Sequence, residues 1–182
     1  MLRIKIPAQE LFDESTNEFL YSKEYDLQLE HSLVSIAKWE SKWQQPFLSD
    51  KPKTNEQTID YVRCMTITQN VPPEAYKFLT SQNMDDIGKY IDSPMTATWF
   101  TSAKESGGSK SKEVITSELI YYWMIAFNIP VEFQKWHLNR LLTLIRICNI
   151  KNQPEKKMSK KEILSRNARL NEERRRAMQS KG

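Results

Sequence analysis

The chain of 182 residues is poor in the residue types on which many catalytic and cofactor sites depend. It contains only four glycines, two cysteines and two histidines. A phosphate-binding loop needs closely spaced glycines at the start of a helix, and the four glycines do not form one. A metal site needs His, Cys or carboxylate ligands at short spacings, whereas His31, Cys64, His137 and Cys148 are scattered. We therefore expect no cofactor, no metal and no enzyme activity.

Long apolar runs are also missing. The longest run, around residues 119–127, is too short to cross a bilayer. The first seven residues alternate apolar and basic side chains and lack the continuous apolar stretch of a signal peptide. Two cysteines far apart in the sequence do not make a disulfide framework. The sequence therefore predicts a soluble protein of a reducing compartment with two free thiols.

Excess positive charge is confined to the last sixth of the chain. Residues 151–182 contain eleven Lys or Arg and four Glu, a net charge of +7, and the whole chain carries +4, so residues 1–150 carry −3. Such a division indicates two parts with different partners. We therefore expect a globular domain over residues 1–150 and a basic C-terminal segment over residues 151–182.

Strand patterns occupy the first thirty residues. Leu2, Ile4 and Ile6 alternate with basic residues, and a second alternation begins at Tyr25. Between them, a polar turn at residues 14–17 separates two short apolar clusters that are typical of paired strands. The sequence predicts a small antiparallel sheet or hairpin there.

Helical periodicity replaces the strand patterns from Ser32 onward, and Ser32 is a suitable N-cap. Thr54 and Gln57 match a capping box for a helix that ends near Thr66. Further helices are expected at residues 74–79, 84–91, 117–128 and 131–149, and Asn83 is the expected cap of the second of these. A surface loop is expected at 101–112. The last two helices should form a central hairpin of the core. The fold class is therefore α+β: a small N-terminal antiparallel sheet, then a mostly helical domain and a basic C-terminal helix.

The basic segment has a thin apolar stripe. A capping box at residues 159–162 opens it, and Ile163, Leu170 and Met178 share one helical face. This stripe is too sparse to fold alone, so we expect the segment to become ordered on a surface. It could keep the protein soluble, neutralise nucleic-acid phosphates, or bind a protein, with Arg166 and Arg174 making charge-assisted contacts. The stripe and the interleaved glutamates favour a protein and disfavour nucleic acid.

Tryptophans are the remaining candidates for contact with a partner. Aromatic residues on amphipathic helices mostly belong to the core, but an exposed tryptophan is a frequent interface residue. Trp39 and Trp99 are the first candidates if they are exposed, and Trp43 and Trp136 join them. For His137, beside an apolar stripe, we expect a hydrogen-bonded core position.

Several runs of sequence also carry a family likeness. They are LEHSLVSIAKWE at 29–40, PMTATWF at 94–100, ELIYYWMIA at 118–126, QKWHLNR at 134–140, and MSKK with NARLN within 158–171. These runs are spread over residues 29–171, so the similarity covers most of the chain, and they resemble tail assembly chaperones of long-tailed, siphovirus-type bacteriophages. None of them is tied to a chemical mechanism.

The resemblance implies a protein of the bacterial host cytoplasm that is absent from the finished virion. Such a protein binds the tape measure protein, keeps it soluble and promotes assembly of the tail tube protein around it; self-association is left open. Two alternatives remain: a structural virion protein, such as a head–tail connector or tail component, and a nucleic-acid-binding regulator. The residues expected to contact protein partners are Trp39, Trp43, Trp99, Trp136, Ile163, Arg166, Leu170, Arg174 and Met178.

Overall fold

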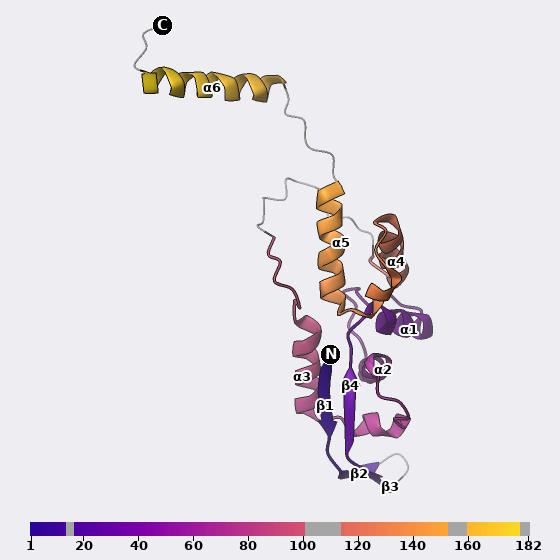
Figure 1. Ribbon diagram of the computed structural model, residues 1–182. Coiled ribbons are helices and arrows are strands. Elements are labelled where there is room, and N and C mark those ends of the chain that lie inside the picture. The colour runs from indigo at the N-terminus through magenta and orange to yellow at the C-terminus, as the bar shows by residue number, and fades with distance from the viewer. Residues whose placement is uncertain (14–16, 101–113, 153–159, 179–182) are drawn as a thin grey trace. The chain divides into compact units, whose positions relative to one another are not determined.

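The computed structural model describes residues 1–13, 17–100, 114–152 and 160–178 (Figure 1). The chain divides into two compact units, Met1–Asn149, which we call the body, and Ile150–Gly182. Three predicted features lie wholly or partly outside the described residues: the turn at 14–17, the loop at 101–112 and the capping box at 159–162.

A two-stranded antiparallel sheet lies at the centre of the body. Strand β1 (Leu2–Ile6) pairs with β4 (Tyr25–Leu29), and Ile4 is opposite Leu27 in the register. The alternation in the sequence places Ile4, Ile6 and the leucines of β4 in the core, as expected for strands with one buried face. A sheet of this kind followed by mostly helical structure confirms the predicted α+β class.

A second ribbon forms from the residues between these strands. Strand β2 (Gln9–Asp13) pairs with β3 (Glu18–Ser22) as an antiparallel hairpin, at the lower end of the body in Figure 1. One face of this hairpin is attached to the body, because Leu20 packs against the core and Gln9 Nε2 donates to the Phe78 carbonyl at 2.6 Å.

Helix α1 (Leu33–Trp43) is the central helix of the body and contacts α2 (Asn55–Met65), α4 (Ser117–Ala126) and the 3₁₀ helix η2 (Val131–Lys135). The sequence predicts its start correctly, since Ser32 caps it and accepts from Ser35 N. The capping box of Thr54 and Gln57 likewise begins α2. The sequence predicted that the last two helices of the body form the centre of its core. In the structure the core is built around α1 instead.

The middle of the chain forms the 3₁₀ helix η1 (Pro73–Phe78) and helix α3 (Ser81–Asp92), which packs beside β1. The predicted cap of α3 is wrong by three residues. Thr80 is the N-cap, and Asn83 is the third helical residue, whose side chain accepts from Thr80 N at 3.2 Å. The Asn83 amide also donates to the Lys5 carbonyl at 3.2 Å, so it attaches α3 to the sheet.

The helix predicted at 131–149 is split in two. Its first residues form η2, Trp136 is extended, and helix α5 runs over Leu138–Asn152. The reason is tertiary: the Leu138 amide donates to the His31 carbonyl at 2.7 Å, and His137 forms a β-bridge with Ser32. These backbone contacts to the end of β4 are incompatible with a continuous helix through Trp136.

The second unit is built from helix α6 (Lys160–Met178). From Ile163 onward all of its described side chains are exposed, and the ion pairs Arg169–Glu173 and Arg176–Glu172 lie along its surface at i,i+4 spacing. A basic helix at this position matches the predicted secondary structure. Among the described residues, no helix is long and apolar enough to cross a membrane.

Candidate protein-interaction site

An apolar groove lies between α4 and α5. It has a volume of about 330 Å³ and is lined by Trp123, Phe127, Leu142, Ile145, Arg146 and Asn149. Trp123 of α4 and the C-cap residue Phe127 are four apart, and the four residues from α5 are spaced by three, one and three, so each helix contributes one face. Five of these side chains are only partly buried or exposed, and only Ile145 belongs to the buried core. We call this feature the α4–α5 groove.

A buried carboxylate holds the α4 side of the groove in place. Glu40, in the last turn of α1, accepts from Phe47 N and from Ser117 N, each at 2.8 Å. Ser117 is the first residue of α4, where backbone N–H groups lack partners within the helix and negative charge is favourable. Glu40 therefore fixes the N-terminus of α4 against α1.

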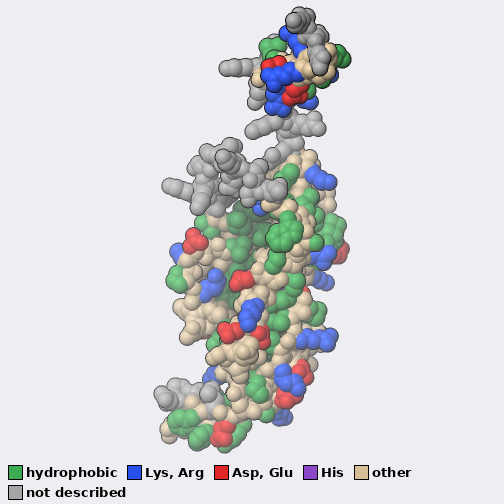
Figure 2. Space-filling view, turned by 90° about the vertical axis from the view of Figure 1, so that its left-hand side faces the viewer, with side chains coloured by type: hydrophobic (Ala, Val, Ile, Leu, Met, Phe, Trp, Pro, Cys, Tyr) green, Lys and Arg blue, Asp and Glu red, His purple; other side chains and the backbone are tan. Residues whose placement is uncertain are grey.

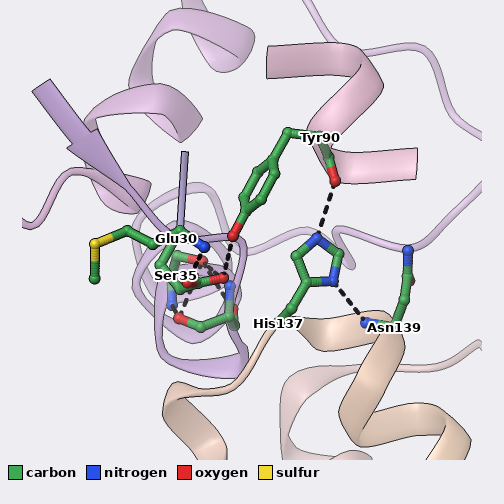
Figure 3. A network of polar contacts seen from close by, with 7 residues as sticks. Glu30, Ser35, Tyr90, His137 and Asn139 are labelled. Atoms are coloured by element: carbon green, nitrogen blue, oxygen red, sulfur yellow. Dashed lines mark hydrogen bonds and ion pairs between the residues drawn. The ribbon is translucent and has the colours of Figure 1, made fainter. Parts of the chain in front are cut away.

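A polar network holds the α5 side in place (Figure 3). His137 Nδ1 accepts from Asn139 N at 3.3 Å, so its Nε2 carries the proton and donates to the Tyr90 carbonyl at 3.0 Å. The Asn139 amide donates to the carbonyls of Ile91 and Ser93 at the end of α3. The Tyr90 hydroxyl donates to Glu30 at 2.6 Å. The start of α5 is thus joined to both α3 and β4.

His31 lies beside this network and is fully buried. Its ring meets that of His137 edge-on, with 5.1 Å between centroids, and its Nδ1 shares a hydrogen bond with the Tyr61 hydroxyl. Burial, and to a smaller degree repulsion from His137, lowers the pKa of His31 to about 4. Burial also lowers the pKa of His137. Both rings are therefore neutral at pH 7 and act as hydrogen-bonding core residues; for His137 this is the predicted role.

Phe100 contacts one of the residues that line the groove. The guanidinium of Arg146, which lines the groove, lies over the ring of Phe100 at 4.1 Å from its centroid. Phe100 is followed by residues outside the described range and preceded by Trp99, which is 88% exposed. An almost fully exposed tryptophan is frequent where a protein contacts a partner. Trp99 thus remains a candidate contact residue.

The other predicted tryptophans lie elsewhere in the body. Trp39 is only 1% exposed and donates to the Gln57 carbonyl, so this core position removes it from the candidate surface. Trp43 is partly buried and donates to Asp60. Trp136 is partly buried and stacks on Phe133 with 3.9 Å between centroids. These two side chains already have partners within the body, which makes them poorer candidates than Trp99.

The predicted residues of the basic segment all lie on α6, in the second unit. Each of them is exposed, and the list is Ile163, Arg166, Leu170, Arg174 and Met178. They remain candidates for contact with a partner, and they lie on a different helix from those that line the α4–α5 groove.

Sequence reasoning missed two surfaces that contain apolar residues, the α4–α5 groove and one face of the β2/β3 hairpin. It assigned the groove residues Trp123, Phe127 and Ile145 to the core, because their helical spacing is the same in either case. A usable signal was the composition of α4, which is apolar on nearly all sides: Tyr122 and Ile125 are exposed although they belong to the same run as the buried Ile120 and Met124. The second surface, on the β2/β3 hairpin, contains Phe12, Phe19 and Tyr21.

No group of three or more potential metal ligands occurs among the described residues. A comparison of the chain with models of known protein families finds no match. Comparisons with curated proteins and with solved structures also find no match.

Proposed function

We propose that this protein is a bacteriophage tail assembly chaperone, which binds the tape measure protein in the host cytoplasm, keeps it soluble and promotes assembly of the tail tube protein around it. The α4–α5 groove is the observation on which the proposal rests. The exposed Trp99 precedes Phe100, whose ring contacts the groove residue Arg146. The likeness of sequence runs such as those at 94–100 and 118–126 to this class of chaperone supports it.

The chemistry of the groove suits an amphipathic helix. Helix-binding grooves take apolar residues at i, i+3, i+4 and i+7 of the bound helix, and the facing rows on α4 and α5 have matching helical spacings. Arg146 and Asn149 lie among the apolar lining residues and provide polar contacts for the rim of such a helix. A tape measure protein exposes long amphipathic helices until the tail tube encloses it, so it presents ligands of this kind.

A groove of about 330 Å³ lies at the lower end of the range of ligand pockets, so it holds only a few side chains of a bound helix. Weak single contacts are compatible with the proposal, because a long helical client presents many similar segments and can be covered by several chaperone molecules. Weak binding also allows the tube subunits to displace the chaperone during assembly.

Co-expression with the tape measure protein of the same phage tests the proposal. We expect the chain to raise the soluble yield of the tape measure protein and to co-purify with it. Trp99→Ser should weaken co-purification because it removes the exposed aromatic, and Asn149→Trp should weaken it because it fills the groove without removing a core contact. Val131→Ser is the matched control, since Val131 is an exposed apolar residue that does not line the groove.

The proposal fails if the chain neither raises the soluble yield of the tape measure protein nor co-purifies with it. Mass spectrometry of purified virions addresses the first alternative, because a connector or tail component is retained in the particle and a chaperone is not. The net charge of residues 151–182 keeps the second alternative open. A nucleic-acid-binding regulator would bind nucleic acid with an affinity that falls steeply as salt is raised.

A further inference from the structure

The outer face of the β2/β3 hairpin carries an aromatic cluster. In the register of the hairpin Phe12 is opposite Phe19 and Glu10 is opposite Tyr21. Because side chains alternate along a strand, these four residues share one face. Phe12, Phe19 and Tyr21 are 46%, 57% and 74% exposed, and the two phenylalanine rings lie 5.0 Å apart. We call this surface the hairpin outer face.

The fold of the body does not account for this cluster. The opposite face of the hairpin is the one that contacts the body, through Leu20 and Gln9. An outer face of a small antiparallel ribbon is normally polar, because it meets water. On this face three of the four residues are aromatic instead. This is the composition of a protein–protein interface, where aromatic side chains are enriched.

The hairpin is also acidic. Its two strands contain no Lys or Arg, and the outer face carries the carboxylate of Glu10. Figure 2 shows hydrophobic and acidic side chains next to one another at this lower end of the body. The carboxylate of Glu10 lies close enough to Tyr21 to share a hydrogen bond with its hydroxyl and to raise the pKa of Tyr21. A ligand for this surface should therefore combine apolar side chains with positive charge.

Helix α6 has this combination. Over Lys160–Met178 it contains seven Lys or Arg and three Glu. Its apolar stripe of Ile163, Leu170 and Met178 is exposed along its length. Both surfaces thus have apolar side chains without a covering partner among the described residues, and their charges are opposite. A helix with so thin a stripe gains most of its stability from packing against a partner, so α6 also benefits from being bound.

We propose that the hairpin outer face of one copy of this protein binds helix α6 of a second copy. The dimensions agree: a five-residue strand is about 17 Å long, and a 19-residue helix is about 28 Å long, so α6 can cover the whole hairpin. Each copy has one hairpin and one α6, so the contact is heterologous and builds open chains or rings. The inference does not depend on the proposed function, because it concerns contact between copies of the chain alone.

Two double variants of the full-length protein test the contact. Phe19→Ser with Tyr21→Ser alters the hairpin, and Ile163→Ser with Leu170→Ser alters α6. Tyr122→Ser with Ile125→Ser is the matched control, because it also replaces two large exposed apolar residues, but on α4. Circular dichroism and thermal melting check that each variant is folded. Sedimentation velocity over a range of protein concentrations then measures association, at low and at high salt.

We expect the wild-type protein and the α4 control to associate as concentration rises, and less so at high salt. The hairpin variant and the α6 variant should each self-associate at least about tenfold more weakly than the wild-type protein, as expected when two interface residues are truncated. A mixture of the hairpin variant with the α6 variant should form a 1:1 dimer and nothing larger. Only one intact hairpin and one intact α6 are then available, on different molecules.

Three results would overturn the inference. One is a wild-type protein that stays monomeric up to about 100 μM, which would also be the result if α6 bound the hairpin of its own chain. Another is association that neither double variant weakens. The third is weakening by one variant without dimer formation in the mixture, since the two surfaces would then not be partners. Client binding by the groove can succeed or fail in each of these cases, so the two proposals are tested separately.

Discussion

Helices α5 and α6 have similar sequence patterns and opposite surroundings. Both carry apolar residues on one helical face, yet Leu138, Leu141 and Ile145 of α5 are buried, whereas the described side chains of α6 are exposed. The α5 stripe meets the core around α1, and its first residue is hydrogen-bonded to His31. An apolar stripe therefore indicates that a helix needs a partner, while tertiary contacts decide whether that partner lies within the chain.

The sharpest test of this comparison is to shorten one leucine in each helix. Leu141→Ala removes a fully buried side chain and should lower the free energy of unfolding by about 3 kcal/mol, through lost burial and a residual cavity. Leu170→Ala should change it by less than about 0.5 kcal/mol, because Leu170 is exposed. Denaturant titration measures both values. Equal losses for the two variants would show that α6 packs as α5 does.

A second prediction concerns the stability of the body at acid pH. The pKa of His31 in the folded body is about 4, below its value of about 6.5 in an unfolded chain. Between these two values the unfolded chain binds more protons, so the body loses stability as pH falls, by about 2 kcal/mol between pH 7 and pH 5. Denaturant titrations of the wild type and His31→Asn at both pH values measure this. A loss that is the same in the variant would contradict the assignment to His31.

The smallest expected effect concerns Glu40. Glu40→Gln keeps the shape of the side chain but turns one of its two acceptor oxygens into a donor that faces a backbone N–H. We expect a loss of about 1 to 2 kcal/mol in unfolding free energy and faster amide exchange at Ser117. Glu118→Gln is the control: Glu118 is exposed in the first turn of the same helix, and its change should stay below about 0.5 kcal/mol. An equal exchange rate at Ser117 in the wild type and in Glu40→Gln would refute this role.

Local signals predicted the fold well. The cap at Ser32 was found because a favoured N-cap residue stands where helical periodicity begins, and the cap at Thr54 because its partner Gln57 is three residues later. The start of α5 was missed because the contact that sets it joins Leu138 to His31, far away in the chain. For α3 the sequence predicted Asn83 as the cap because Asn is a favoured N-cap residue, but Thr80, which is also a favoured type, is the residue that caps the helix.

The candidate site was harder to predict, because burial depends on the whole fold. Trp39 and Trp43 lie four apart on α1, but the first is enclosed by the core and the second is only partly buried. Trp123 has the spacing of a core residue, and it lines the groove because α4 and α5 leave a space between them. On the hairpin, Phe12 and Phe19 became a candidate surface only once the register showed which face they share.

The edges of the central sheet have a consequence for aggregation. The edge of β4 that does not pair with β1 is covered by the chain at the end of α2. There Glu30 N donates to the Met65 carbonyl, and Ile67 N donates to the Gln28 carbonyl. On the other side, the Asn83 amide binds the Lys5 carbonyl of β1. An exposed strand edge invites pairing with another chain. A substitution that loosens either cover would thus do more than weaken the fold, because it would open a site for uncontrolled strand exchange between molecules.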